Sequence, residues 1–228
     1  MNKNRKIIPY IDLKSQWKEE RDELLPIIDK VMSSGKFILE TECIKFEESV
    51  AKLCGVKYAA ALNSGTDALM FSLVLSGIKK GDEVITPSNS FIASTSSIVH
   101  IGAKPVFVDV LPNQNMDPSK IEDLITKSTK AIMPVHLSGR VCDMDPILEI
   151  AERHNLIIIE DAAQAIGSKY KGKPAGSLGN IGCFSTHPLK NLNACGDGGF
   201  ITTNDEDIYK KLVSFRNHGK VSRFVVSE

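Results

Sequence analysis

Lys190 stands in a stretch of sequence that could support chemistry by an amine nucleophile. It follows Pro188 and Leu189 and precedes a glycine-rich turn, Gly196-Asp197-Gly198-Gly199. Most lysines are solvated surface charges, and a lone lysine would be interpreted in that way. A lysine surrounded by small and apolar residues loses its proton more readily, and its free amine can then attack carbonyl carbons. Lys190 is therefore a candidate catalytic residue.

Asp161 is a second residue whose position indicates a function. It follows Glu160 at the end of the apolar run Ile157-Ile158-Ile159, which is typical of a buried strand. A buried, unpaired acid costs several kcal/mol, so Asp161 requires a cationic partner, a metal or a helix end. The two adjacent acids also resemble a Walker B strand end, but the sequence contains no G-x-x-x-x-G-K-[ST] motif.

Two further segments could bind a phosphate and a planar ring. Ser64-Gly65-Thr66 is a small, hydroxyl-bearing turn that leads directly into a helical pattern, where free N–H groups favour a phosphate. The alternative is that Ser64 or Thr66 only caps the helix. Phe91 follows an apolar run and could lie against a planar ring, although an ordinary core position is the simpler interpretation. No G-x-G-x-x-G follows a strand, which disfavours a dinucleotide site.

The alternation of short β-branched runs with amphipathic stretches predicts the elements that would position these residues. It favours an α/β fold, with a mostly parallel seven-stranded sheet and helices on both faces. Ligands of such sheets bind beyond the carboxyl ends of the strands, which is where all four candidate segments fall. Helical spacing also predicts two N-terminal helices that end at Gly35 and Gly55. The predicted strands are 57–62, 83–86, 105–110, 131–136, 156–160, 182–185 and 199–202, and the later helices are 66–76, 92–101, 118–126, 144–155 and 206–217.

Composition excludes several classes of protein. The 228 residues hold 28 Lys+Arg and 28 Asp+Glu, so bulk attraction to nucleic acid or an anionic membrane is not expected. The hydrophobic content of 42% is too high for a disordered chain. Five scattered cysteines without a C-x-x-C pair indicate neither a disulfide framework nor a metal site, and they favour the cytoplasm.

Taken together, the segments resemble the DegT/DnrJ/EryC1/StrS family of sugar aminotransferases, which have the aspartate aminotransferase type I fold. The resemblance extends from about Tyr10 to Gly219 and consists of an ordered set of motifs, which makes it specific. The matching motifs are 64–69, 87–91, 134–137, 160–164, 184–191 and 196–199.

The resemblance implies pyridoxal 5'-phosphate as cofactor and a role for each motif residue. Lys190 would form a Schiff base with the cofactor, Asp161 would pair with its ring nitrogen, and Gln164 would lie near its phenolic oxygen. Phe91 would stack on the ring. The phosphate would be held by Gly65, Thr66 and Ser185.

The resemblance also points to three other residues without giving each a definite role. His136 lies where the family has a strand-end residue near the active site, and its role is left open. Asn191 follows the lysine and would belong to the outer surroundings of the cofactor. His218 lies in a segment that resembles one near the substrate.

The implied reaction moves an amino group from an amino acid, commonly glutamate, to a keto-sugar carried on a nucleotide. Such enzymes serve amino-sugar, surface-polysaccharide or antibiotic-sugar biosynthesis. The Asp197 turn favours a dTDP-3-keto-6-deoxyhexose over a 4-keto sugar, because many members that aminate C4 have glutamate there. Two alternatives are a catalytically inactive, cofactor-binding regulatory homologue and a cysteine desulfurase that uses Cys195. Relatives that act as dehydratases replace the lysine with histidine, so Lys190 argues against that branch.

The resemblance also implies a domain organisation. We expect an N-terminal helical segment at 1–55, a cofactor-binding large domain at 56–219, and the start of a truncated C-terminal region at 220–228. The small C-terminal domain of the family would then be largely absent. The family further implies a homodimer whose active sites are completed by the neighbouring subunit.

Overall fold

The computed structural model describes residues 8–220, and the chain divides into two compact units, Met1–Lys45 and Phe46–Glu228. The first unit holds helix α1 (Leu13–Ser34), which begins where Asp12 accepts a hydrogen bond from the N–H of Ser15. It ends at Gly35, whose φ of 66° is in the left-handed region, as the sequence predicts. No described helix is long and apolar enough to span a membrane.

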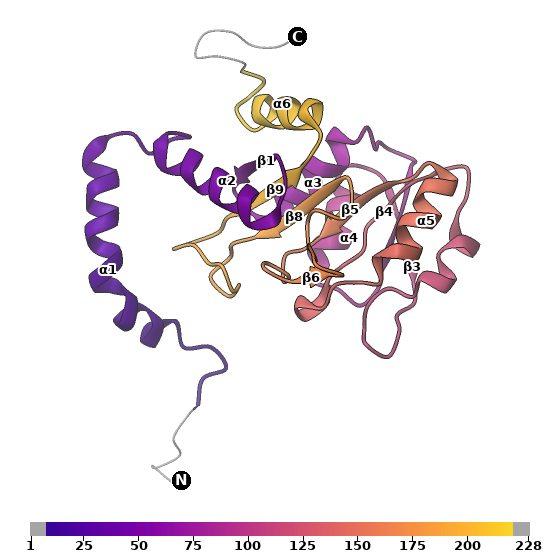
Figure 1. Ribbon diagram of the computed structural model, residues 1–228, viewed down its shortest axis with the longest axis horizontal. Helices are drawn as coiled ribbons and strands as arrows, with labels where there is room; N and C mark the ends of the chain where they lie inside the picture. Colours follow the sequence, from indigo (N-terminus) through magenta and orange to yellow (C-terminus); the bar gives the residue numbers. More distant parts are fainter. Residues whose placement is uncertain (1–7, 221–228) are drawn as a thin grey trace. The chain divides into compact units, whose positions relative to one another are not determined.

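The second unit contains the seven-stranded sheet, in the order β1-β9-β8-β5-β4-β2-β3 (Figure 1). Only β9 runs antiparallel to its neighbours, so the carboxyl ends of the other six strands share one edge. The strands are β1 (Tyr58–Leu62), β2 (Glu83–Pro87), β3 (Lys104–Val108), β4 (Thr129–Ile132), β5 (Ile157–Asp161), β8 (Ile181–Ser185) and β9 (Gly199–Thr203). The mostly parallel sheet predicted from the sequence is confirmed.

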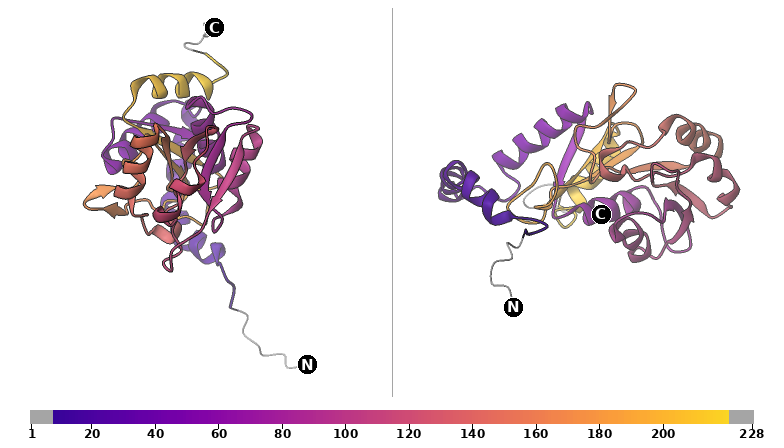
Figure 2. Two further views of the ribbon diagram at one scale, coloured as in Figure 1. Left: turned by 90° about the vertical axis from the view of Figure 1, so that its right-hand side faces the viewer. Right: turned by 90° about the horizontal axis from the view of Figure 1, so that it is seen from below.

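Helices cover both faces of this sheet (Figure 2). Side chains that alternate along each strand face opposite layers, so Ile159 packs with helices α3, α4 and α6 while Ile158 packs with α5. A third apolar cluster joins the end of α2 to Phe184 and Phe200, whose rings stack at 4.5 Å. The helices are α2 (Thr41–Cys54), α3 (Gly65–Leu75), α4 (Ile92–His100), α5 (Met144–His154) and α6 (Glu206–Phe215).

The structure corrects two predicted elements. Residues 118–126 form two short 3₁₀ turns, η1 (Pro118–Lys120) and η2 (Glu122–Leu124), in place of one helix. The helical segment ends at Leu124, before the predicted end at 126, and the N–H of Thr126 donates to the hydroxyl of Thr129 instead of to a helical carbonyl. The strand predicted at 131–136 ends at Ile132, since Pro134 has no N–H to continue the ladder. A short hairpin of β6 (Lys169–Tyr170) and β7 (Lys173–Pro174) was not predicted.

Helix α2 crosses the boundary between the two units, and its last turns belong to the second. Val50 and Cys54 are buried against the sheet there, and Glu47 forms an ion pair with Arg216 at the end of α6. Glu47 also accepts the N–H of Ala61 in β1. These contacts explain why the second compact unit begins at Phe46.

Candidate active site

A cavity of about 550 Å³ opens at the edge where the carboxyl ends of the parallel strands meet. Residues that follow five different strands line it, although they are far apart in the sequence. Its lining includes Ser64, Gly65 and Thr66 after β1, Ser90 and Phe91 after β2, Val135 and His136 after β4, Asp161, Ala163 and Gln164 at the end of β5, and Ser185, His187, Leu189 and Lys190 after β8.

The first turn of α3 forms one wall of the cavity. Ser64 caps the helix by accepting the N–H of Asp67, so capping is its role in this structure. The N–H groups of Gly65 and Thr66 begin the helix and have no intrahelical acceptor, which leaves them available to an anion. A Cβ on Gly65 would lie 2.7 Å from the Cβ of Ser185, so only glycine permits this close approach. The wall therefore combines free donors with the positive end of a helix.

Asp161 lies at the tip of β5 and lines the same cavity. Its Oδ2 accepts the hydroxyl of Ser94 at 2.6 Å, and its Oδ1 accepts the N–H of Ala163 at 3.2 Å. Burial raises the pKa of Asp161, and the hydrogen bonds from Ser94 and Ala163 and the charge of Lys190 partly counter this rise. A buried carboxylate that lines a cavity in this way is suited to a cationic ligand group.

Gln164 is oriented by the backbone of a neighbouring turn. The N–H of Ser138 donates to Gln164 Oε1 at 2.6 Å, and Ser138 has the unusual φ of 54°. Since the amide oxygen is occupied, the amide nitrogen of Gln164 remains as a donor at the cavity. Such a donor suits a phenolic or phenolate oxygen.

Lys190 lies in the loop that connects β8 to β9. Its N–H donates to the carbonyl of His187 at 2.8 Å, which closes a tight turn and directs the lysine to the cavity lining. The loop is fastened to the strands because the N–H of Thr186 donates to Gly198 and that of Ala194 to Thr186. The lysine is half-buried, in contrast to a solvated surface lysine.

Phe91 is 68% exposed although it is a large aromatic residue. It lies directly before α4 and lines the cavity. An ordinary core position is therefore excluded for Phe91. An exposed ring at a cavity mouth is available to stack on a ligand.

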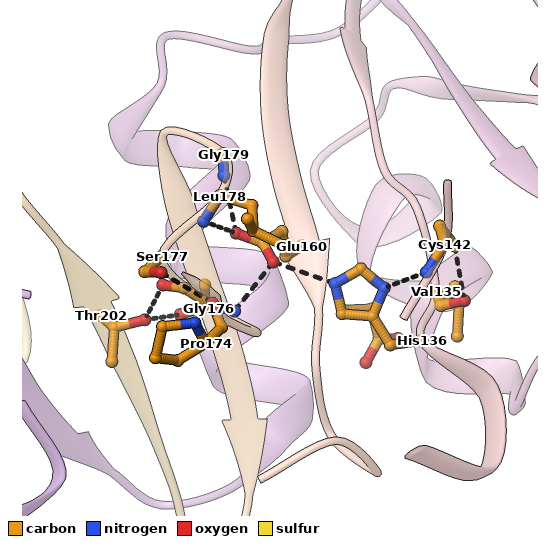
Figure 3. A network of polar contacts seen from close by, with 12 residues as sticks. Val135, His136, Cys142, Glu160, Pro174, Gly176, Ser177, Leu178, Gly179 and Thr202 are labelled. Carbon is orange, nitrogen blue, oxygen red and sulfur yellow. Dashed lines mark hydrogen bonds and ion pairs between the residues drawn. The ribbon is translucent and has the colours of Figure 1, made fainter. Parts of the chain in front are cut away.

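His136 and Glu160 form a buried pair next to the cavity, at the centre of the network in Figure 3. His136 Nε2 lies 2.9 Å from Glu160 Oε2, and the N–H of Cys142 donates to His136 Nδ1. Nδ1 therefore carries no proton, and Nε2 is the nitrogen that donates to Glu160. Both ring nitrogens of His136 are thus engaged with protein groups.

The structure brings most of the predicted site residues together and leaves two outside. Gly65, Thr66, Phe91, His136, Asp161, Gln164, Ser185 and Lys190 all line the cavity. Asn191 and His218 are exposed and do not line it. Asn191 belongs to the loop between β8 and β9, and His218 follows the end of α6.

Sequence reasoning missed three residues of the site. Ser94 and Ser138 donate to Asp161 and Gln164, and Glu160 anchors His136. The only sequence signal for Ser94 is its position one helical turn after Ser90, in a stretch where serines are frequent. The partners of Ser138 and Glu160 depend on tertiary packing.

The cysteines do not favour sulfur chemistry. Burial raises the pKa of Cys54 and of Cys142 to about 12, which keeps both thiols protonated. Burial also raises the pKa of Cys183. Cys195 is exposed and is not part of the cavity lining.

Comparison with known sequences identifies relatives along nearly the whole chain. The chain is 44% identical over 218 residues to the pleiotropic regulatory protein of Geobacillus stearothermophilus, covering 95% of this chain and 59% of that protein. It is 52% identical over 203 residues to the GDP-perosamine synthase of Caulobacter vibrioides, covering 88% and 53%. Other relatives are named for aminotransfer to UDP-linked or dTDP-linked sugars.

Solved structures give the same result for the fold. DesV of S. venezuelae, solved in complex with a ketimine intermediate, superimposes with a TM-score of 0.93 at 40% identity. The match covers 97% of this chain and 60% of DesV. Other matching structures are described in forms with pyridoxal or pyridoxamine phosphate.

The chain therefore spans only 53% to 59% of the length of the two curated relatives described above. The sequence profile of one family nevertheless matches residues 18–227, which is almost all of it. By sequence and fold, this chain belongs to the DegT/DnrJ/EryC1/StrS aminotransferase family.

Proposed function

We propose that this chain binds pyridoxal 5'-phosphate and transfers an amino group from an amino acid to a keto-sugar carried by a nucleotide. The observation that carries this proposal is that Lys190 and Asp161 line one cavity together with the first turn of α3. An amine, a buried carboxylate and an anion-binding helix end are the three groups that this cofactor requires. The family and the names of the relatives support the same reaction.

The residues present fit the cofactor. Gly65 lets the start of α3 approach Ser185 more closely than any Cβ would allow, and the free N–H groups of that turn line the cavity where a phosphate could bind. Asp161 is buried and needs a cationic partner, which a protonated ring nitrogen would provide. Gln164 presents an amide donor for the phenolic oxygen. When bound, the cofactor supplies a conjugated ring that accepts electrons from the substrate carbon.

The chain's own residues would divide the remaining tasks. Lys190 Nζ would hold the cofactor covalently and, when released, carry a proton to and from the substrate's Cα. Asp161 would keep the ring nitrogen protonated through its carboxylate. Phe91 would cover one face of the ring and exclude water from it. Ser185, whose hydroxyl accepts the N–H of His187, would contribute to the phosphate site.

The sugar that we propose is a dTDP-3-keto-6-deoxyhexose, with glutamate as the amino donor. This choice rests on the aspartate in the turn before β9, where Asp197 lines the cavity. The competing substrate is a 4-keto sugar nucleotide, and the printed names of relatives include GDP-, UDP- and dTDP-linked sugars. The proposal therefore includes dTDP as the nucleotide that carries the sugar.

A second candidate function is cofactor binding without turnover in a regulatory protein. One observation favours it, namely that a relative with 44% identity is named a pleiotropic regulatory protein. The retention of both Lys190 and Asp161 in the cavity favours catalysis, because binding alone does not require a lysine that can move a proton.

The attachment of the cofactor can be tested directly. The chain is incubated with pyridoxal 5'-phosphate, reduced with borohydride, digested and examined by mass spectrometry. We expect the reduced cofactor on Lys190, and its absence from the Lys190→Ala variant. Lys173→Ala, which removes an exposed lysine of β7, is the matched control and should label like the wild type. Labelling of a different lysine would refute the assignment.

The reaction is tested in two further steps. Glutamate alone should convert the bound cofactor to its amine form, which changes its absorbance, whereas a purely regulatory protein would show no conversion. A panel of 3-keto and 4-keto nucleotide sugars should then yield an amino sugar only with the 3-keto compounds. Formation of product only from the 4-keto compounds would show that the substrate is a 4-keto sugar nucleotide.

The proposed assembly is a homodimer in which a neighbouring subunit completes the cavity. The support is the family, together with the partly open position of Phe91. Native mass spectrometry of the cofactor-loaded chain should give twice the monomer mass. A monomer that binds the cofactor with full affinity would contradict this part of the proposal.

A further inference from the structure

Two serines connect the surface of the cavity with the buried carboxylate of Asp161 through two short hydrogen bonds. Ser90 Oγ lies 2.6 Å from Ser94 Oγ, and Ser94 Oγ donates to Asp161 Oδ2 at 2.6 Å. Ser90 is half-buried and lines the cavity, whereas Ser94 is fully buried at the start of α4. The hydroxyls therefore form a chain from the cavity surface to the interior.

The direction of this chain follows from how many protons each group has. A serine hydroxyl has one O–H to donate, and an ionised carboxylate can only accept. Because Ser94 gives its proton to Asp161, it can only accept from Ser90, and Ser90 must be the donor. Both hydroxyls thus point toward Asp161 when the carboxylate is ionised.

Asp161 has capacity left after these contacts. A carboxylate has about four lone-pair sites. Ser94 occupies one site on Oδ2, and the N–H of Ala163 occupies one on Oδ1. The carboxylate lines the cavity, so a remaining site can receive a donor that is bound there.

We propose that Ser94 is a positioning residue, which fixes Asp161 in one orientation and favours its ionised form so that it can receive a cationic ring nitrogen in the cavity. Ser90 supports it as the outer donor of the chain. This inference rests on the proposed function, because the ring nitrogen belongs to the cofactor.

The electrostatics of Asp161 agree with this role. Burial is the largest influence on the pKa of Asp161 and raises it, which favours the neutral acid. The hydrogen bond from Ser94 is the strongest of the influences that lower this pKa. Without the hydroxyl, the carboxylate would lose both its anchor and its main stabilising donor.

Helix α4 offers a matched control for this hydroxyl. Ser97 is buried on the same helix, one turn after Ser94, and donates its hydroxyl to the carbonyl of Ser94. Ser97→Ala removes an equally buried hydroxyl but leaves the contact with Asp161 in place. A merely structural role would give the two variants the same behaviour.

The test compares Ser94→Ala, Ser97→Ala and the wild type by the Kd for pyridoxal 5'-phosphate, titrated by absorbance. We expect the Kd of Ser94→Ala to rise about tenfold, the size of one lost hydrogen bond to a charged group, and that of Ser97→Ala to stay at the wild-type value. Thermal unfolding of the cofactor-free variants should give similar losses for both. Inorganic phosphate, which would occupy only the start of α3, should bind all three proteins equally.

Three results would overturn the inference, and one of them would overturn the proposed function as well. Equal Kd values for Ser94→Ala and Ser97→Ala, with the wild type binding the cofactor, would overturn the role of Ser94 and leave the proposed function intact. A wild type that does not bind the cofactor would overturn the proposed function itself, and this inference with it. If Ser94→Ala does not fold, Ser90→Ala replaces it, and a Kd equal to that of the wild type would overturn the inference.

Discussion

Glu160 and Asp161 are neighbours at the end of β5, and the pleat of the strand sends their carboxylates to opposite faces of the sheet. Glu160 faces the side of the short hairpin, where it accepts the N–H groups of Gly176, Leu178 and Gly179 and the imidazole of His136 (Figure 3). Asp161 faces α4 and the cavity, where the hydrogen bonds of its carboxylate within the described residues come from Ser94 and Ala163.

The two carboxylates differ in how many of their acceptor sites receive a hydrogen bond from the protein. Four donors match the four lone-pair sites of the Glu160 carboxylate, so this charge is balanced within the fold. Asp161 is also buried, although it lines the cavity, and its carboxylate accepts from only two donors among the described residues. A buried carboxylate with spare acceptor capacity is costly to ionise, and a donor bound in the cavity would offset this cost. Glu160 therefore stabilises the fold around the site, whereas Asp161 keeps acceptor capacity at the cavity that a ligand could use.

The largest effect on stability is expected from Glu160→Ala. This change leaves three backbone N–H groups and the Nε2–H of His136 without an acceptor in the interior. Removing one partner of a buried, hydrogen-bonded pair costs about 3–5 kcal/mol of the free energy of unfolding. Urea denaturation of the cofactor-free chain measures this loss.

The control for this prediction is Glu149→Ala, an exposed position on α5, which should change stability by less than about 0.5 kcal/mol. If Glu160→Ala unfolds at the same urea concentration as the control, the four hydrogen bonds contribute nothing net. The contrast with Asp161 would then be lost.

Asp161→Asn is expected to have the opposite profile. Turnover should fall by about 100-fold, because the amide cannot hold a proton on the ring nitrogen as a carboxylate does. The free energy of unfolding should change by no more than about 1 kcal/mol, since the amide has the same shape and its oxygen can accept from Ser94. Single-turnover kinetics and urea denaturation of the same preparation give both numbers. Near-normal turnover would remove Asp161 from the mechanism.

A smaller effect is expected at the first turn of α3, where we propose that the phosphate binds. Gly65→Ala places a Cβ 2.7 Å from the Cβ of Ser185, so α3 or β8 must shift. Such overpacking costs about 1–3 kcal/mol, and it should also weaken the binding of inorganic phosphate. Calorimetric titration with phosphate tests this, and Gly77→Ala, which meets no atom within 4 Å but has a positive φ, separates backbone strain from crowding. Equal phosphate binding by both variants would show that the close approach at Gly65 is not needed.

The position of Asp161 could be predicted from the sequence because it depends on local patterns. The run Ile157-Ile158-Ile159 predicts a strand covered on both faces, and ligands of parallel sheets bind beyond the strand ends. The period of two along a strand also implies that Glu160 and Asp161 face opposite sides. The pattern does not predict which of these two sides faces the cavity.

The partners of the two carboxylates could not be predicted in the same way. Glu160 meets a turn 16 to 19 residues later in the chain, and this pairing exists only after the hairpin has packed against β5. Ser94 is one of several serines between residues 88 and 97, and the orientation of α4 about its axis determines that Ser94 is the one that donates to Asp161. The early end of β4 is different, since Pro134 was visible in the sequence as a residue that cannot donate to a ladder.

The pH dependence of stability gives the smallest effect and isolates Asp161 from its neighbour. Burial raises the pKa of Asp161 in the folded, cofactor-free chain above the value of about 3.9 that an unfolded aspartate has. Between these two values the folded state binds more protons than the unfolded state, so stability falls as the pH rises through this window. This contribution of Asp161 to stability is complete below the unfolded pKa and is lost as the pH rises through the folded pKa. It amounts to about 1.4 kcal/mol for each unit by which the two pKa values differ.

The free energy of unfolding of the wild type minus that of Asp161→Asn should therefore decrease as the pH is raised from about 4, and then level off. Urea denaturation at a series of pH values measures this difference, in which groups common to both proteins cancel. A difference that does not vary with pH would mean that Asp161 ionises as it does in water, and that the protein already stabilises its charge without a ligand.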